Sequence, residues 1–299
     1  MPTPTDPASP QTVLVTGASS GIGRATAMEL AGRGARLVLV ARGREPLEET
    51  AAEALAAEAQ AALVRLADVT DEDAVRAAVD DALAEFGRLD VVVHGAQVMA
   101  YGRIEDVPRE VYEQVVDVGL HGTAVVARVV LPLFRKQGAG HLVVVNSLLG
   151  NIAAPLLGSY VAAKWGQLGL VRVLQQETRD EPGISVSAVQ PGGVNTPIYV
   201  HAASWTGSTG RPPPPVYSPQ RVARVVLSTL DRPRRIVQAG IFNPLITAGF
   251  RLVPGVFDVL VGPLLQRMAI SDDAIPPTEG NVFESQSGTD ETEGYWRST

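Results

Sequence analysis

Thr16-Gly17-Ala18-Ser19-Ser20-Gly21-Ile22-Gly23 is the stretch that decides the fold of this 299-residue chain. An apolar run over residues 12–15 leads directly into it, and apolar residues at helical spacing follow over residues 22–33. Glycines allow a tight turn and a close approach of the backbone to a phosphate, while the N-terminus of a helix offers free N–H groups. A strand, a glycine-rich turn and a helix in this order therefore indicate a dinucleotide-binding site.

Short apolar runs alternate with longer amphipathic segments outward from this turn. The apolar runs are continuous, which is typical of strands buried on both faces of a parallel sheet. Because a helix follows each strand, the chain is expected to adopt an α/β fold with a doubly wound parallel sheet, its ligand at the carboxyl ends of the strands. Strands are expected over residues 12–15, 37–40, 63–66, 91–93, 141–145, 184–189 and 235–238, and helices over residues 22–33, 45–62, 71–86, 108–135, 160–179 and 221–230.

The order of these segments assigns residues 11–240 to a single α/β domain. Inside it, residues 197–219 contain four consecutive prolines and several glycines, and a long irregular segment of this kind indicates a lid over a substrate. Residues 241–270 are a hydrophobic C-terminal extension. The polar residues 1–10 and 271–299 are expected to be tails, the first flexible and the second extended.

The composition excludes several classes of function. Cysteine is absent, which rules out disulfides and cysteine nucleophiles, and the four histidines are not paired at ligand spacing, so no metal is expected. A net charge of −7 argues against nucleic acid as a partner. Prolines, glycines and charged residues interrupt the apolar stretch 241–270, so no transmembrane segment is expected, and the default localisation is cytoplasmic.

The end of the second expected strand bears on which dinucleotide is bound. An acidic residue there would accept hydrogen bonds from a ribose 2′-hydroxyl, but this chain has Ala41-Arg42-Gly43-Arg44. The guanidinium of Arg42 suits a 2′-phosphate, so NADP is favoured over NAD; the alternative is that both arginines are solvated. Asp68 and Val69 follow the third expected strand, where they would meet an adenine, unless Asp68 only caps the next helix.

Tyr160 and Lys164 lie four residues apart on one face of an expected helix. The lysine is one of only two in the chain, so this spacing is improbable by chance. A cation near the phenol is expected to lower the tyrosine pKa, which would let Tyr160 exchange a proton with an alcohol or a carbonyl. Ser147, just past the fifth expected strand, would polarise the same carbonyl oxygen. The alternative is an ordinary exposed Tyr–Lys pair.

The order of these motifs resembles the short-chain dehydrogenase/reductase family over residues 11–200, and Pro191-Gly192-Gly193-Val194-Asn195-Thr196 extends the match. The resemblance implies a Rossmann-like seven-stranded sheet, a nicotinamide cofactor and a homodimer or homotetramer. It also implies that Tyr160 is the acid/base, that Ser147 orients the oxyanion, and that Lys164 binds the ribose and tunes the tyrosine. The expected cofactor-binding residues are Gly17, Ser19, Ser20, Gly21, Ile22, Gly23, Arg42, Asp68, Val69, Gly95, Ala96, Tyr160, Lys164, Pro191, Gly192, Val194 and Thr196.

The chain departs from the family pattern in two places. The fourth strand, which usually ends in Asn-Asn-Ala-Gly, is followed by His94-Gly95-Ala96-Gln97. Gly119 stands where the family has a helical asparagine that holds a water for proton relay to the lysine. Gly119 would leave room for that water but offers no side-chain carbonyl to hold it, and His121 points to another face of the helix. Either turnover is slower, in which case Gly119→Asn would raise it, or the chemistry is altered or lost.

The motifs together predict an NADP(H)-dependent oxidoreductase that transfers hydride between the nicotinamide and a ketone or secondary alcohol on a hydrophobic small molecule. The alternative is a cofactor-binding protein with weak or no redox turnover, or with non-redox chemistry. Tyr199, Trp205 and residues 241–265 suggest an apolar pocket or a contact between monomers. The resemblance implies that Leu148, Leu149 and residues 98–101 line that pocket. Helices expected over residues 220–230 and 256–268 suit an oligomer interface better than a membrane surface.

Overall fold

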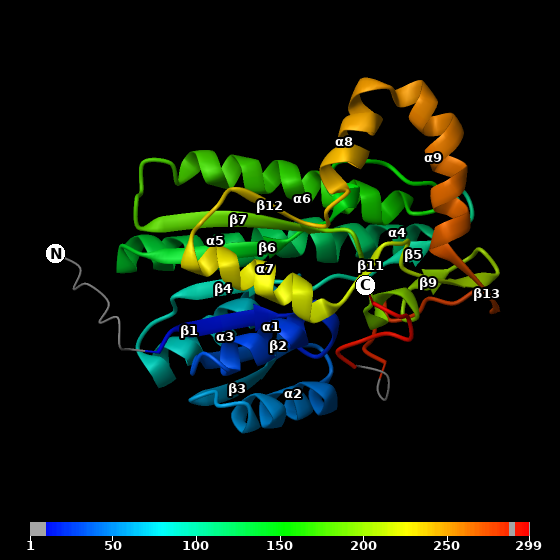
Figure 1. The fold of residues 1–299 in the computed structure, drawn as a ribbon. Helices are drawn as coiled ribbons and strands as arrows, with labels where there is room; N and C mark the ends of the chain where they lie inside the picture. The colour runs from blue at the N-terminus through cyan, green and yellow to red at the C-terminus, as the bar shows by residue number, and fades with distance from the viewer. Residues whose placement is uncertain (1–9, 287–290, 299) are drawn as a thin grey trace.

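A seven-stranded sheet with the strand order β12-β7-β6-β4-β1-β2-β3 forms the centre of the computed structural model, which describes residues 10–286 and 291–298 (Figure 1). All neighbouring strands in it are parallel. The expected doubly wound α/β fold is therefore confirmed, whereas the tail expected over residues 1–10 lies outside the described residues except for Pro10. The strands of the sheet are β1 (Thr12–Thr16), β2 (Arg36–Ala41), β3 (Ala61–Leu66), β4 (Val91–His94), β6 (Gly140–Val145), β7 (Ile184–Pro191) and β12 (Ile236–Ala239).

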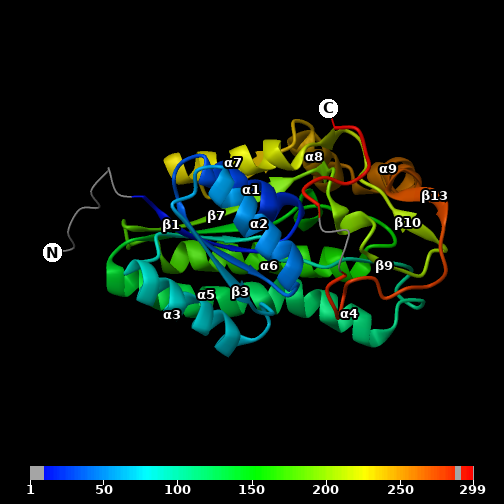
Figure 2. The ribbon, with the colours of Figure 1, turned by 90° about the horizontal axis from the view of Figure 1, so that it is seen from below.

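Helices cover both faces of the sheet, which explains why its strands are largely apolar (Figure 2). Successive residues of β1 point to opposite faces: Val13 and Val15 join one buried cluster with Leu30 of α1, and Leu14 joins another with Phe134 of α5. The first face carries α1 (Gly21–Ala31), α2 (Arg44–Ala56) and α7 (Pro219–Asp231); the second carries α3 (Glu72–Phe86), α5 (Gly122–Gln137) and α6 (Gly158–Glu177).

The helix expected over residues 45–62 is shorter in the structure, where α2 ends at Ala56. Glu58 adopts a positive φ of 77°, and the next residues turn back toward the sheet. Ala61 and Ala62 then pair with Arg36 and Leu37 of β2. The helix propensity of alanine is thus outweighed by strand pairing, which belongs to the tertiary fold and cannot be seen in a local window.

The helix expected over residues 108–135 is interrupted beside the cleft. α4 (Arg109–Val116) and α5 are joined by η1 (Asp117–His121), a turn of π-helix with Gly119 at its centre. The helical run Arg109–Gln137 is also the one described segment whose length and composition would let it cross a membrane. However, 56% of its most apolar window is buried inside the domain. We therefore assign this run to the core layer that contacts α3 and α6.

The connections near the cleft contain shorter elements, and the segment 197–219 is more regular than expected. Its short strands pair with strands from elsewhere in the chain: β9 with β5, β10 with β13, and β11 with β8. The remaining elements of this region are β5 (Ala100–Tyr101), η2 (Leu148–Gly150), β8 (Gly193–Val194), η3 (Pro197–Tyr199), β9 (Ala203–Ser204), β10 (Ser208–Gly210), β11 (Val216–Tyr217) and β13 (Ile270–Ala274).

The hydrophobic extension forms two helices, α8 (Asn243–Leu252) and α9 (Pro254–Ala269), that stand away from the domain (Figure 1). Leu252 and Val259 on this pair are 80% and 72% exposed. The described part of residues 271–299 is not an extended tail: β13 pairs with β10, and the chain then returns across the domain. Backbone hydrogen bonds from Asn281 to His201 and from Gly294 to Asn195 hold it there. The polar composition of the segment does not reveal such contacts, so it led to the expectation of a tail.

Candidate active site

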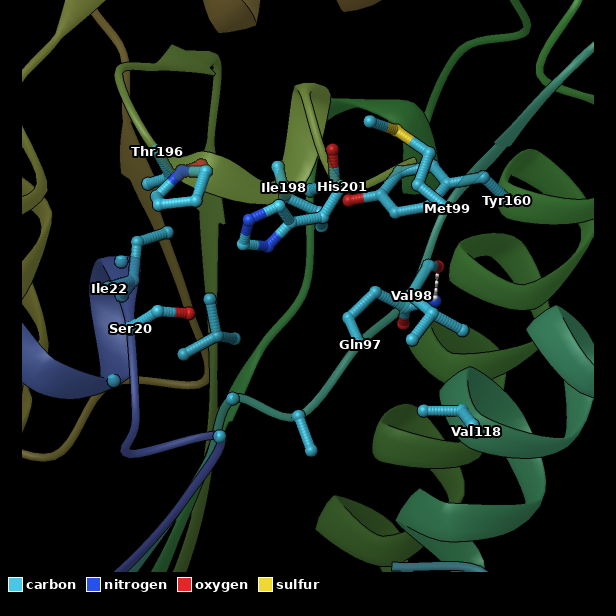
Figure 3. A pocket seen from close by; sticks show the side chains of 18 of the residues that line it. Ser20, Ile22, Gln97, Val98, Met99, Val118, Tyr160, Thr196, Ile198 and His201 are labelled. Atoms are coloured by element: carbon cyan, nitrogen blue, oxygen red, sulfur yellow. Dashed lines mark hydrogen bonds between the residues drawn. The ribbon is translucent and has the colours of Figure 1, made fainter. Parts of the chain in front are cut away.

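A cleft crosses the carboxyl ends of the strands, where the strand order reverses between β1 and β4 (Figure 3). Such a crevice is the usual ligand site of an open parallel sheet. Every residue that the sequence assigned to catalysis or to cofactor binding lines this cleft. The cleft thus brings together the glycine-rich turn, Arg42 and Asp68 at one end, and Ser147, Tyr160 and Lys164 at the other.

Packing requires the glycines of the turn between β1 and α1. Gly17 has φ of +68°, and a Cβ atom there would lie 2.9 Å from the backbone nitrogen of Ala96. A Cβ at Gly23 would lie 2.0 Å from the carbonyl oxygen of Gly17. Ser20 is the N-cap of α1 but makes no side-chain capping hydrogen bond. The start of this helix therefore suits an anion, and its donors fit the phosphates of a dinucleotide.

Arg42 lies at the far end of the cleft and contacts the returning C-terminal segment. Its guanidinium donates hydrogen bonds to the carbonyl oxygens of Asn281, Val282 and Phe283, at 2.5, 3.0 and 3.1 Å. It also lies 4.0 Å from a carboxylate oxygen of Asp68. The side chain is thus held at the cleft by a segment 240 residues further along the chain, so it is neither solvated nor part of a local helix start.

Asp68 does not cap the helix that follows it. Its carboxylate accepts hydrogen bonds from the backbone N–H and the hydroxyl of Thr70, at 2.9 and 2.7 Å. The N-cap of α3 is Asp71, whose side chain accepts from the N–H groups of Asp73 and Ala74. The capping alternative for Asp68 is therefore wrong, and its carboxylate is left to line the cleft beside Arg42.

The last part of the chain reaches the glycine-rich turn. The N–H of Gly21, the first residue of α1, donates to the carbonyl oxygen of Glu291 at 3.0 Å. The Trp296 ring packs edge-on against Tyr199, with 5.7 Å between ring centroids. The Glu291 carbonyl thus occupies the N–H of Gly21, a donor that would also suit a phosphate. No local feature of the polar sequence 271–299 indicated this contact.

Tyr160 and Lys164 from α6 meet Ser147 from the end of β6. Burial raises the pKa of Tyr160 to about 12, and a hydrogen bond with Ser147 opposes the rise. Burial also lowers the pKa of Lys164 to about 7. The lysine Nζ lies 5.7 Å from the centre of the Tyr160 ring and donates to the carbonyl oxygen of Val145 at 3.0 Å. The pKa of Tyr160 therefore moves in the direction opposite to the expected one, because burial of the phenol outweighs the hydrogen bond with Ser147.

His94 occupies the position of the first asparagine in the family's Asn-Asn-Ala-Gly. Its Nδ1 lies 2.9 Å from the hydroxyl of Thr16, and its ring is 1% exposed. Burial, followed by the charge of Lys164, lowers the pKa of His94 to about 3. His94 is therefore neutral near neutral pH, and its contact with Thr16 joins β4 to β1.

The space at Gly119 is already filled, contrary to the expectation that it would leave room for a water. A Cβ on Gly119 would lie 2.7 Å from the Oε1 of Gln97 and 2.9 Å from the Cβ of Ala163. Gln97 also donates from Nε2 to the carbonyl oxygen of Val98 at 2.7 Å, and its Oε1 is buried (Figure 3). The large side chain of Gln97 after β4 therefore fills the volume that the missing side chain of Gly119 in η1 leaves free.

The reacting end of the cleft opens into an apolar chamber. The residues that line it include Tyr199 and, of those that the resemblance implied, Val98, Met99, Tyr101, Leu148 and Leu149 but not Ala100. His201 also lines it, and burial lowers the pKa of its imidazole (Figure 3). Sequence reasoning missed His201, since no motif marks a histidine inside an irregular segment. Trp205, expected either in an apolar pocket or in a contact between monomers, does not line the cleft; it packs against the buried cluster that contains Val98 and Val282.

A family model described as short chain dehydrogenase matches residues 11–207. The chain belongs to the short-chain dehydrogenase/reductase family, and it is a dehydrogenase or reductase acting on CH–OH or C=O groups. A cis-4-hydroxycyclohexanecarboxylate dehydrogenase of Sinomonas cyclohexanicum is 35% identical to it over 240 residues, which are 79% of this chain and 90% of the relative.

Two solved structures share this fold. The alcohol dehydrogenase of the archaeon Thermococcus sibiricus, complexed with 5-hydroxy-NADP, has a TM-score of 0.67 and 28% identity over 77% of this chain and 95% of its own. A short-chain dehydrogenase/reductase from Burkholderia phymatum in complex with NAD has a TM-score of 0.73 and 25% identity, over 84% of this chain and 95% of its own. Members with this fold thus bind either nicotinamide cofactor, and the family is supported by structure as well as by sequence.

Gly119→Asn is expected to lower both turnover and thermal stability, in contrast to the gain that the sequence alone suggested. Its Cβ would overlap Gln97 and Ala163, and overpacking of this kind costs roughly 1–3 kcal/mol. Thermal unfolding and steady-state kinetics measure the effect. Gly169→Asn on α6 is the matched control, because a Cβ there has nothing within 4 Å. The double variant Gln97→Gly/Gly119→Asn should recover part of the loss; a gain from Gly119→Asn alone would contradict this account.

Removal of residues 291–299 is expected to strengthen nicotinamide cofactor binding by roughly fivefold, the value of about one hydrogen bond. The deletion releases the N–H of Gly21 from the Glu291 carbonyl. Fluorescence titration with NADPH measures the dissociation constant, and Trp296→Ala tests whether the ring contact with Tyr199 contributes to holding the segment. Weaker binding after the deletion would show that the segment belongs to the binding site instead of competing for it.

Proposed function

We propose that this protein is an NADP(H)-dependent oxidoreductase that transfers hydride between the nicotinamide and a ketone or secondary alcohol on a hydrophobic small molecule. The observation that carries the proposal is the meeting of Ser147, Tyr160 and Lys164 at the end of a cleft that begins at the glycine-rich turn. A bound nicotinamide would supply or accept the hydride. Substrate orientation and proton transfer fall to the protein.

Tyr160 is the proposed proton donor to the carbonyl oxygen. With a pKa of about 12 its phenol keeps its proton near neutral pH, which suits reduction of a carbonyl. Ser147 accepts the backbone N–H of Leu149 at 3.1 Å, so its hydroxyl is held at the end of β6 beside Tyr160. From there it would orient the same oxygen. Lys164 would contact the cofactor's ribose and favour the phenolate that remains once the proton has left.

The preference for NADP rests on Arg42. Its guanidinium lies beside Asp68 at the end of the cleft, where a 2′-phosphate would make charge-assisted hydrogen bonds. The neighbouring carboxylate of Asp68 works in the opposite direction, because it repels a phosphate. The three carbonyl contacts of Arg42 hold the cation in place, and this supports the proposal that a 2′-phosphate shares it with the C-terminal segment.

The proposed substrate is apolar around its reacting carbon. Met99, Leu157 and Ile198 line the chamber next to Tyr160, and such walls favour a hydrocarbon skeleton over a sugar. The relative from Sinomonas cyclohexanicum is named for a hydroxylated cyclohexane carboxylate, a secondary alcohol on a hydrocarbon ring. A homodimer or homotetramer and a cytoplasmic localisation remain part of the proposal, with the exposed apolar residues of α8 and α9 as the expected interface.

Mixing the protein with NADPH is expected to change the nicotinamide fluorescence. Hydrophobic ketones from a panel should then oxidise NADPH, measured as a loss of absorbance at roughly 340 nm, where the reduced nicotinamide absorbs. Tyr160→Phe should reduce turnover by about 10²-fold or more while it leaves the cofactor dissociation constant nearly unchanged, since the phenol acts as acid/base. Binding without turnover across the whole panel would favour the alternative of a cofactor-binding protein. Failure to bind either cofactor would refute both.

Arg42→Asp is expected to lower the ratio of kcat/KM for NADPH to that for NADH by about tenfold or more, because a cation for the 2′-phosphate is replaced by an acceptor for a 2′-hydroxyl. Arg44→Asp is the matched control: Arg44 lies two residues further on, is exposed and pairs with Glu48 at 3.2 Å. An unchanged ratio in Arg42→Asp, or an equal change in both variants, would remove Arg42 from the cofactor site. Thermal unfolding reports whether the C-terminal segment is loosened as well.

A further inference from the structure

Gln167 lies behind the reacting end of the cleft and is 1% exposed. It comes from α6, one turn after Lys164, and its side chain joins α6 to the end of β6 and to the π-helical turn η1. No motif in the sequence marks this position. A glutamine amide buried beside a buried lysine needs partners for all its polar atoms, so its contacts define what it does.

All the hydrogen-bonding capacity of this amide is used. Its Oε1 accepts from the Nζ of Lys164 at 3.1 Å and from the Nδ2 of Asn146 at 2.9 Å. Its Nε2 donates to the carbonyl oxygen of Gly119 at 2.9 Å and to the hydroxyl oxygen of Thr123 at 2.8 Å. Each of the four contacts thus pairs a donor with an acceptor.

The surroundings determine the orientation of the amide. Rotating it by 180° would place the NH₂ group against the ammonium of Lys164 and the amide of Asn146, which are both donors, and the oxygen against the Gly119 carbonyl. Asn146 is held in turn, since its Nδ2 also donates to the carbonyl oxygen of Lys164 at 3.0 Å and its Oδ1 accepts from Gln190 at 3.2 Å. The network therefore has one arrangement of donors.

Lys164 obtains one of its hydrogen-bond acceptors from this arrangement. Its Nζ donates to two oxygens, the carbonyl oxygen of Val145 and the Oε1 of Gln167. The titratable groups that face it are Tyr160 on its own helix and His94 at the end of β4, and neither supplies a negative charge near neutral pH. Two neutral acceptors thus oppose the desolvation that lowers the pKa of Lys164 to about 7.

We propose that Gln167 is the positioning residue of Lys164: its amide connects the lysine Nζ directly to the Gly119 carbonyl oxygen and keeps the ammonium facing the cleft. Any effect on turnover rests on the proposed function, whereas the effect on the lysine itself does not. Gly119 contributes only backbone to this connection, so it needs no side chain of its own. Thr123 reinforces it, because its hydroxyl donates to the same carbonyl oxygen at 2.8 Å.

The test uses the whole chain with isotope-labelled lysine, whose Nζ and Cε signals report protonation without any turnover. Only Lys136, which is exposed, contributes a second signal. Gln167→Met keeps the length and shape of the side chain but removes its acceptor, and it should lower the Lys164 pKa by about one unit. Gln167→Glu keeps an acceptor at Oε1, so its lysine pKa should be equal to that of the native protein or higher.

Gln175→Met is the matched control. Gln175 lies on the same helix, is 6% exposed and donates to the carbonyl oxygens of Val186 and Arg235, away from Lys164. Loss of this glutamine should reduce thermal stability while the Lys164 titration stays where it was. If Gln167→Met fails to fold, the comparison of Gln167→Glu with the native protein still decides: a lower lysine pKa in Gln167→Glu would overturn the proposal.

An unchanged Lys164 pKa in folded Gln167→Met would likewise overturn it, as would a shift of the same size in Gln175→Met. Where the native protein turns over a carbonyl substrate, the limb of its pH–rate profile should move with the lysine pKa in Gln167→Met and return in Gln167→Glu. Absence of turnover in the native protein would refute the proposed function alone, because the lysine titration would still report on Gln167.

Discussion

The parallel pairing of β1 with both β2 and β4 is the constraint on which the remaining structure depends. A parallel sheet needs cover on both faces, and the connecting helices supply it. The carboxyl ends of all strands then lie at one edge of the sheet. β2 and β3 lie on one side of β1, and β4, β6 and β7 lie on the other. The loops part at that point, which opens a cleft lined by backbone from the glycine-rich turn and by side chains from β6 and α6.

Local patterns in the sequence predicted the sheet and most of the cleft, because strand burial and the glycine-rich turn depend on neighbours in the chain. The same patterns failed where distant segments decide. Ala61 and Ala62 become part of β3 because β2 lies beside them, although alanine favours helix. The described part of residues 271–299 is held by backbone groups of His201, Asn195 and Gly21, and backbone donors leave no mark in a sequence. A polar stretch therefore looked like a tail.

The electrostatics of the reacting end could not be predicted from spacing either. The spacing of four residues from Tyr160 to Lys164 places both groups on one helix face, but the depth of their burial decides which protonation form each group prefers. Lys164 is 2% exposed, and its ammonium is stabilised there by hydrogen bonds to two neutral oxygens, those of Val145 and Gln167. Desolvation thus raises the pKa of the phenol and lowers that of the ammonium. A contact between the two groups cannot offset this, because the lysine directs its hydrogen bonds elsewhere.

The departures from the family pattern acquire a different meaning once they are placed in space. Taken singly, Gln97 and Gly119 look like a misplaced large residue and a lost side chain, and Gln167 lies at a position that no motif marks. In the structure Gln97 fills the volume beside Gly119, and Gln167 takes the carbonyl oxygen of Gly119 as its acceptor. A side chain added at Gly119 would create an overlap, and loss of the Gln167 amide would leave buried polar groups without a partner; either is costly in a packed interior. The two departures, Gln97 and Gly119, therefore fit each other, and Gln167 links the backbone of Gly119 to Lys164 at the cleft.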